Sequence, residues 1–249
     1  MMAKKYFYIL GIFIFVSFLN GCETVKDAKR PEPQTMRGVP VFQGHNREIL
    51  ATDLKFDQES GRLEYTLPED AYVRVRIGLP NGGALLRTLV DWEKRSAGHH
   101  MEVWNKKDTS GQIDFSHYKD IMIVLMCVSQ NSDPADSSPP IKGSRRSPEF
   151  EIAFPNARKT KKGLPIFKDA VSLRVVIQEE DFKWLTEAKY EIAFFIDNIF
   201  LNEDEEGTSP YNYLFSARGF NGGEHILTAN VVAYSGETAA KSIKIFIEK

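Results

Sequence analysis

The stretch that decides the fold is YVRVRIGLPNGGALLRTLVDW, residues 72–92. Apolar residues recur at every second position before residues 80–83, which is the period of a half-buried β-strand. A Pro-Asn-Gly-Gly sequence between two such runs is a strong turn signal. Residues 72–92 therefore predict two strands joined by a tight turn.

The same alternation continues on both sides of this stretch. Short β-type segments with turn residues about every eight to twelve positions predict a sandwich or a barrel. Helical spacing is not sustained anywhere, and residues 181–188 are long enough for no more than a helical turn. The further predicted strands are residues 63–67, 100–104, 121–128, 171–177, 190–197, 211–217, 225–234 and 240–248.

A region rich in Ser, Pro and Asp, residues 131–148, is predicted to be a long loop inside the first of two units. We expect residues 48–154 to form a first unit that residues 150–154 close as its last strand. Residues 155–165 are predicted to be a basic linker and residues 166–249 a second unit. The linker can contact acidic lipid or polymer, or it can be a solvated hinge. Its cations are Arg158, Lys159, Lys161 and Lys162.

The amino-terminal residues have the layout of a secretory signal peptide. Lys4 and Lys5 precede an uncharged apolar run of about 14 residues, which is shorter than the roughly 20 residues of a membrane-spanning helix. The run ends in Leu-Asn-Gly-Cys, residues 19–22, which resembles the signal motif of bacterial lipoproteins. The resemblance implies that residues 1–21 are cleaved off and that Cys22 is lipidated. An ordinary leader, or a signal anchor with a chance cysteine, is the alternative.

The lipid is expected to hold the chain at a membrane, because two or more acyl chains anchor a protein stably where one does not. In lipoproteins of enteric bacteria, an aspartate after the cysteine retains the protein at the inner membrane. Glu23 stands at that position here, so the resemblance implies the outer membrane. Residues 22–47 are charged and contain prolines, and they are predicted to be a flexible tether. Cys127 then has no partner for an internal disulfide and is predicted to be a small buried hydrophobe.

Residues 63–128 resemble the immunoglobulin-like domain of bacterial flagellar hook-capping proteins, a module that recurs in many exported bacterial proteins. The likeness is carried by YTLPEDAYVRVRIG and LLRTLVDWEKRSAGHHMEVWNKKDTSG. It implies a buried Trp104 and turns at Gly98 and Gly111. The family's Gly-x-Tyr turn is replaced by FSHYKDIMIV, which leaves the shape of that loop open.

Residues 190–248 resemble the bacterial Ig-like modules of cell-surface and carbohydrate-associated proteins. The matching segments are AFFIDN, SPYNYLFSA and GGEHILTANVVAYSGETAAKSIKIFI. The resemblance implies that His225 has a structural role, with a hydrogen bond near the start of a strand. Together the two halves predict an all-β protein with two tandem immunoglobulin-like β-sandwiches, a fold that does not by itself indicate a function.

An acidic segment, residues 202–207, is a weak candidate for calcium binding, because calcium prefers hard oxygen ligands in loops. The segment lacks the alternating spacing and central glycine of a dedicated calcium loop, and a solvated β-turn is the alternative. Its carboxylates are Glu203, Asp204, Glu205 and Glu206.

Two adjacent histidines, His99 and His100, point to opposite faces if they lie on a strand. The two rings therefore cannot easily share a metal ion. A partner such as His117 can join one of them, and turn histidines are the alternative. No cofactor is predicted.

The motifs of common enzymes do not occur: the sequence has no Gly-x-Ser-x-Gly, phosphate loop or His-Glu-x-x-His. Two carboxylates of a glycosidase can still converge in space. The net charge of −2 implies no attraction to nucleic acid. We expect a non-enzymatic, lipid-anchored protein of the bacterial cell envelope with a structural, adhesive or assembly-accessory role. Its sheet edges can accept a strand of a protein partner. The alternative is a module that binds polysaccharide or another envelope ligand, including as an accessory to an enzyme.

Overall fold

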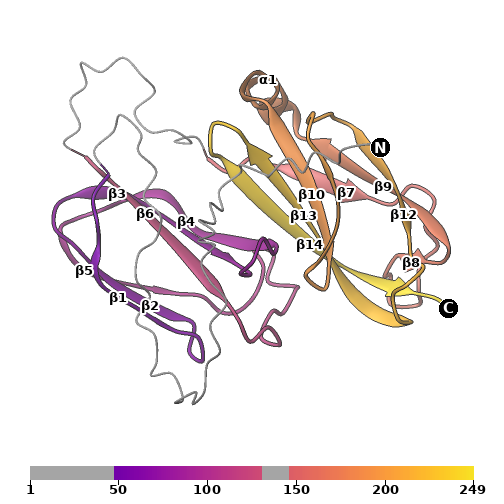
Figure 1. Cartoon of the computed structure of the whole chain (residues 1–249), viewed down its shortest axis with the longest axis horizontal. Coiled ribbons are helices and arrows are strands. Elements are labelled where there is room, and N and C mark those ends of the chain that lie inside the picture. Colours follow the sequence, from indigo (N-terminus) through magenta and orange to yellow (C-terminus); the bar gives the residue numbers. More distant parts are fainter. Residues whose placement is uncertain (1–47, 131–145) are drawn as a thin grey trace, which may run out of the picture.

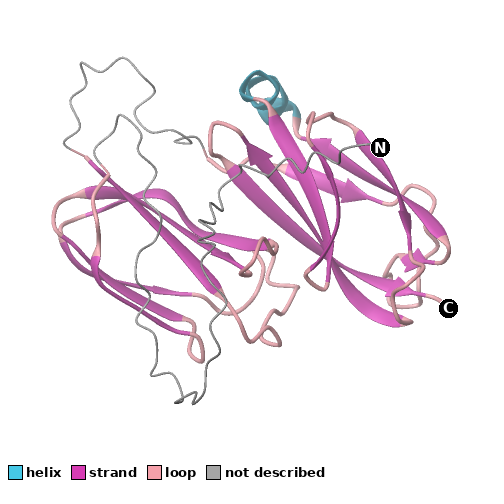
Figure 2. Cartoon of the chain, viewed as in Figure 1, coloured by secondary structure: helices cyan, strands magenta, loops and turns pink. Residues whose placement is uncertain are grey.

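The computed structural model describes residues 48–130 and 146–249. Figure 1 shows that the strands of these two ranges form two groups, and Figure 2 shows the helix beside the strands of the second group. The prediction of an all-β fold is confirmed. No helix in the described ranges is long and apolar enough to cross a bilayer. The predicted signal peptide, Cys22 and the tether lie outside the described residues.

The first unit is a sandwich of two three-stranded antiparallel sheets, with strand orders β1-β2-β5 and β4-β3-β6. The pairing of β2 with β5 and of β3 with β6 is the pairing of strands B with E and C with F in immunoglobulin-like sandwiches. The strands are β1 (Thr52–Asp57), β2 (Arg62–Leu67), β3 (Ala71–Gly78), β4 (Leu85–Arg95), β5 (Gly98–Val103) and β6 (Met122–Ser129).

Trp104 lies in the core of the first unit, as predicted, with 1% of its surface exposed. Its indole Nε1–H donates to the Lys107 carbonyl at 2.9 Å, and its backbone N–H donates to the Gly61 carbonyl at 2.9 Å. Gly61 has a φ of +72°, and a Cβ atom there would lie 2.0 Å from the Trp104 carbonyl oxygen. Only glycine fits this position, so the close packing of the loop before β2 against the backbone of Trp104 requires Gly61.

Cys127 is buried in the same core, as predicted. Burial raises the pKa of its thiol to about 12. Because the thiolate is the reactive form, the thiol is inert at neutral pH and acts as packing.

The turn predicted at residues 80–83 joins β3 to β4 and is confirmed. The Gly83 N–H donates to the Pro80 carbonyl at 3.1 Å. Asn81 and Gly82 have φ values of +59° and +75°, which is the left-handed backbone of a type I′ turn. This turn lies on the side of the first unit that faces the second.

The second unit has sheets of order β12-β9-β7 and β11-β10-β13-β14-β8. All neighbours are antiparallel except β14 and β8. The order is that of an immunoglobulin-like sandwich in which β7, β9 and β12 correspond to A, B and E, while β10, β13 and β14 correspond to C, F and G. The strands are β7 (Phe150–Ala153), β8 (Ile166–Phe167), β9 (Ala170–Ile177), β10 (Tyr190–Ile196), β11 (Ile199–Asp204), β12 (Tyr211–Ser216), β13 (Gly223–Ala233) and β14 (Thr238–Ile247).

The prediction that residues 150–154 close the first unit is wrong. β7 pairs with β9, and the Phe150 side chain is buried in the core of the second unit. The alternating pattern correctly indicated a strand, but it contains no information about the sheet that the strand joins. The connection between the units therefore lies before β7, and not at residues 155–165.

Residues 155–165 form a loop between β7 and β8 inside the second unit, so the predicted linker between units is also wrong. The Thr160 N–H donates to the Leu164 carbonyl at 2.8 Å, which closes the loop. Arg158 forms an ion pair with Glu248 at 2.6 Å. This end of the loop is thereby tied to the carboxyl-terminal residues.

Three strands were not predicted: β1, β11 and the two-residue strand β8. β1 and β11 are edge strands: TDLKFD alternates over only two apolar positions, Leu54 and Phe56, and IFLNED does not alternate. The predicted helical turn is part of α1 (Glu179–Ala188), which has three acidic residues in its first turn. Negative charge near a helix amino terminus favours the helix.

Candidate functional site at the junction of the two units

The two units meet through the sheet β4-β3-β6 of the first and the hairpin β13–β14 of the second. Figure 1 shows β4 beside β14, and these strands are in contact. Phe195 of β10 belongs to the core of the first unit rather than the second and is 5% exposed. Since an apolar side chain of one unit completes the core of the other, the junction is a packed interface.

Two tight turns, one from each unit, are in direct contact at one end of the junction. Asp197 and Asn198 connect β10 to β11 with φ values of +46° and +68°, so this turn is also type I′. The Asn198 Oδ1 accepts a hydrogen bond from the Ala84 N–H at 3.2 Å. A Cβ atom on Gly83 would lie 2.5 Å from that oxygen, so the Pro-Asn-Gly-Gly turn leaves room for the asparagine.

Asn230 of β13 pairs with the backbone of Leu85 in β4. Its Oδ1 accepts from the Leu85 N–H at 2.8 Å, and its Nδ2 donates to the Leu85 carbonyl at 2.9 Å. The carboxamide therefore takes the place of a neighbouring strand. β4 is an edge strand, and unpaired backbone groups at an edge would otherwise need water or another chain.

Two arginines of β3 are buried at the junction although they alternate with core residues. Arg74 is 1% exposed and Arg76 is 4% exposed. The Arg74 Nη2 lies 2.7 Å from the Asp91 Oδ1, which is an ion pair within the first unit. The Arg76 Nη2 donates to the Gly236 carbonyl at 2.7 Å, which links β3 to the turn between β13 and β14.

Burial disfavours the charge on both guanidinium groups. Desolvation lowers the pKa of Arg74, and the nearby Asp91 carboxylate opposes this effect. Desolvation and then repulsion by Arg74 lower the pKa of Arg76 to about 9. Both groups remain protonated at neutral pH, and Glu237 of the second unit stabilises both charges. A buried charge cluster thus spans the two units.

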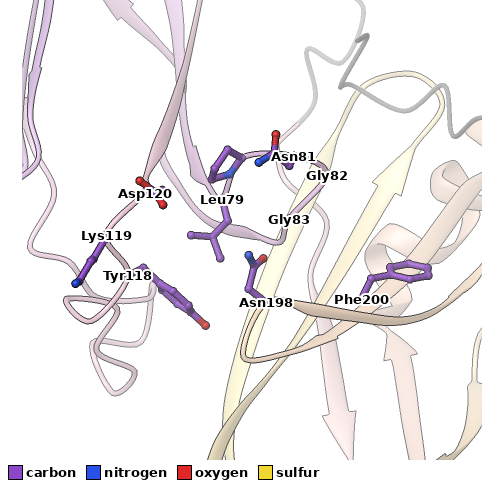
Figure 3. Close-up of a pocket in the computed structure, with 10 residues that line it drawn as sticks. Leu79, Asn81, Gly82, Gly83, Tyr118, Lys119, Asp120, Asn198 and Phe200 are labelled. Atoms are coloured by element: carbon purple, nitrogen blue, oxygen red, sulfur yellow. The ribbon is translucent and has the colours of Figure 1, made fainter. Parts of the chain in front are cut away.

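A pocket of about 330 Å³ opens beside the two turns, and both units line it. In Figure 3, the Asn198 carboxamide points toward the turn that carries Gly83, the Tyr118 ring lies on one side of Asn198, and Phe200 lies on the other side with its ring directed away from Asn198. Burial, and then the negative charge of Asp197, raise the pKa of Tyr118 to about 12. Its hydroxyl is therefore a neutral hydrogen-bond donor at neutral pH.

The mouth of this pocket carries exposed polar side chains. Asn81, Lys119 and Asp120 line it and make no side-chain hydrogen bond or ion pair with any described residue. Asp120 is the one carboxylate among the lining residues, so the pocket does not contain the acid pair of a glycosidase. The arrangement can bind a small molecule, and it has no nucleophile with an adjacent base.

The carboxylates of the weak calcium candidate do not gather into one cluster in the structure. Glu203 and Asp204 lie in β11, and Glu205 and Glu206 follow it, so half of the expected loop is strand. Burial and the neighbouring Glu205 raise the pKa of Glu203. In the described ranges, no group of three or more His, Cys, Asp or Glu residues is placed to hold a metal ion.

The histidines named above do not come together either. The His100 Nε2 lies 2.7 Å from the Ser96 carbonyl oxygen, and its ring stacks on Tyr65. His117 packs against Tyr118 with ring centroids 4.1 Å apart. His99 is exposed on the opposite face of β5 from His100, which agrees with the predicted alternation.

The predicted structural role of His225 agrees with its hydrogen bonds. Its Nδ1 contacts the Asp197 carboxylate, and its Nε2 lies 2.9 Å from the Asn221 carbonyl oxygen. The other oxygen of Asp197 accepts from the Ile226 N–H at 2.9 Å. His225 and Asp197 together hold the β10–β11 turn in position for its contact with the first unit.

Glu191 of β10 is a buried carboxyl group whose burial is expected to lower stability at neutral pH. Burial, and then Glu203 and Glu205, raise its pKa. Because the pKa is higher in the folded than in the unfolded state, stability is lost as pH rises above the unfolded-state glutamate pKa of about 4.3. Glu191→Gln is therefore expected to raise the urea midpoint at about pH 7 and to change little at about pH 3. Equal midpoints for the two proteins at neutral pH would contradict this account.

Comparisons with known proteins identify no family for this chain. No family model matches it, and no curated protein matches it. A mannanase from Thermotoga petrophila has a TM-score of 0.32 and 14% identity over 42% of this chain and 20% of its own. Fibronectin(III)-like modules of Clostridium thermocellum CbhA have a TM-score of 0.31 and 12% identity over 76% of this chain and 87% of theirs. The chicken interferon gamma receptor alpha chain has a TM-score of 0.30 and 9% identity over 81% of this chain and 98% of its own. These values are too low to indicate a function, so the chain is assigned by its own strand order to the all-β sandwiches.

Proposed function

We propose that this chain is a non-enzymatic, lipid-anchored protein of the bacterial cell envelope that presents a rigid two-unit scaffold to an envelope protein partner. The observation that carries the proposal is the packed junction, in which Phe195 and Asn230 of the second unit contact the first and Arg76 of the first contacts the second. A fixed orientation keeps surfaces on the two units at a constant spacing, which is useful for assembly or adhesion. A chain built for chemistry would need converging reactive groups instead.

An edge strand of the first unit offers a surface for the partner. β5 lies at the edge of the sheet β1-β2-β5. It exposes the side chains of Met101 and Val103, which are large and apolar. An unpaired strand edge with apolar side chains favours addition of a partner strand, because main-chain hydrogen bonds supply affinity and side chains supply specificity.

The proposed anchor is tested by replacing Cys22. Cys22→Ser is expected to abolish labelling by a fatty-acid analogue and to move the protein from the membrane fraction to the soluble fraction, because serine lacks the thiol that is acylated. Cys127→Ala is the matched control, since that thiol is buried and should not affect labelling. Retention of the Cys22→Ser protein in washed membranes would refute the anchor.

The proposed partner surface is tested by affinity purification from detergent-solubilised envelopes. The wild-type chain is expected to recover an envelope protein that Val103→Lys loses, because an edge lysine disfavours strand addition. Leu214→Lys is the matched control, because Leu214 is equally apolar and exposed but lies on β12 of the second unit. If Val103→Lys recovers the same proteins as the wild type, the β5 edge is not the contact surface.

A further inference from the structure

The pocket at the junction has aromatic side chains on both sides. Tyr118 comes from the loop before β6 of the first unit and packs on Phe115, with ring centroids 6.1 Å apart. Phe200 comes from β11 of the second unit, is 49% exposed, and meets Phe195 edge-on at 5.8 Å. A half-exposed phenylalanine held in place by another ring offers a flat apolar face to a ligand.

The polar groups of the pocket are carboxamides and one pair of opposite charges. Asn81 and Asn198 can donate and accept hydrogen bonds, and the Tyr118 hydroxyl can do both. Lys119 and Asp120 are adjacent in sequence and of opposite charge, so the mouth carries no net charge. A phosphate or a metal ion would need an excess of one sign, whereas a neutral ligand with many hydroxyl groups matches this set.

The centre of the pocket, at Asn198 and the two turns, is fixed before any ligand arrives. Asn198 is held by its hydrogen bond to the Ala84 N–H, and both flanking turns are tight type I′ turns. A pre-formed site does not lose binding energy to the ordering of its own groups. The volume of about 330 Å³ is at the lower end of the usual range for small-molecule sites, roughly 300–1,000 Å³.

We infer that this pocket binds a neutral carbohydrate of one or two sugar rings, with a ring face against Phe200 and hydroxyl groups on Asn81 and Asn198. This binding activity goes beyond the proposed scaffold function. Because residues of both units line the pocket, the packed junction is required for the site to exist. Sugar binding would thus depend on the contact between the two units.

The inference is tested with the full-length chain in a detergent that has no sugar headgroup. Saturation-transfer NMR with cellobiose, mannobiose, diacetylchitobiose and lactose is expected to show binding of at least one disaccharide. Phe200→Ala is expected to weaken that binding about tenfold, which corresponds to about 1.4 kcal/mol. Tyr234→Ala is the matched control, because Tyr234 is equally exposed but does not line the pocket.

Two results would overturn the inference: binding of none of the disaccharides, or equal affinity of the wild-type and Phe200→Ala proteins. Since Phe200 is half-exposed, its replacement should leave the fold intact, and circular dichroism of the variant verifies this. Asn198→Ala provides a second measurement, because it removes a polar group at the centre of the pocket. If the pocket is the binding site, Asn198→Ala should weaken binding of the same disaccharide.

Discussion

Replacement of Trp104 by alanine is expected to destabilise the first unit by about 3–5 kcal/mol. The ring is 1% exposed and fills the core between the two sheets, so its removal leaves a cavity as well as a loss of apolar burial. The lost indole also removes the closer of two donors to the Lys107 carbonyl, which then keeps only the Arg87 Nη1 at 3.3 Å. Few single residues in this unit combine a large buried volume with a buried polar contact.

Urea unfolding monitored by circular dichroism measures this effect. Met101→Ala is the matched control, because Met101 is three residues away but 49% exposed, and it is expected to change stability by less than about 0.5 kcal/mol. Trp104→Phe retains an aromatic ring but lacks the N–H, and its stability should fall between the two. A Trp104→Ala protein as stable as Met101→Ala would show that the ring does not support the core.

The turn at residues 80–83 could be predicted because its signal is local, whereas the burial of Trp104 was implied by the family resemblance of residues 63–128. A type I′ turn needs left-handed backbone at its two central residues, and Asn-Gly meets that need wherever it occurs. The alternation of polar and apolar residues likewise identified β3, β9 and β14 without knowledge of their partners. These features depend on the residues themselves and their immediate neighbours.

The junction could not be predicted, because it depends on contacts between residues far apart in the chain. Arg74 and Arg76 occupy the polar positions of an alternating strand, which usually face solvent. Their burial follows from the second unit, whose Gly236 carbonyl lies more than a hundred residues further along the chain. β7 was assigned to the wrong unit for the same reason, since strand pairing is a tertiary property.

The pocket could be anticipated only in part. The Pro-Asn-Gly-Gly turn was recognised, and Asp197-Asn198 is a recognisable type I′ sequence in retrospect. Nothing in either segment indicates that the two turns meet. Phe200 was overlooked because β11 has no clear alternation of polar and apolar residues. Without that pattern, the sequence does not indicate that the Phe200 ring is exposed.

Replacement of Asp91 by alanine is the second large effect that we expect, with a loss of about 3 kcal/mol. Asp91 is the ionic partner of Arg74, which is 1% exposed. Its other oxygen accepts hydrogen bonds from the Ser147 N–H at 2.7 Å and the Ser147 Oγ at 2.8 Å. The substitution therefore leaves a buried guanidinium without its carboxylate and also releases the segment that leads into β7.

Glu93→Ala is the matched control for this prediction. Glu93 lies on the same strand and also pairs with an arginine, Arg95, at 3.0 Å, but its side chain is 58% exposed. Exposed ion pairs contribute little, so a change of less than about 1 kcal/mol is expected. The comparison separates the effect of burial from the effect of losing one acidic residue from β4.

A double variant, Arg74→Met with Asp91→Leu, tests whether the cost comes from the unpaired charge. Replacement of both partners of a buried ion pair by apolar residues is often neutral or stabilising, whereas loss of one partner is costly. The double variant is thus expected to recover most of the stability that Asp91→Ala loses, with urea unfolding as the measurement. If Asp91→Ala destabilises the protein as little as Glu93→Ala, the charge on Arg74 is stabilised by the second unit, including Glu237, rather than by Asp91. If the double variant is as unstable as the single one, the hydrogen bonds to Ser147 are the dominant contribution, and the segment before β7 depends on them.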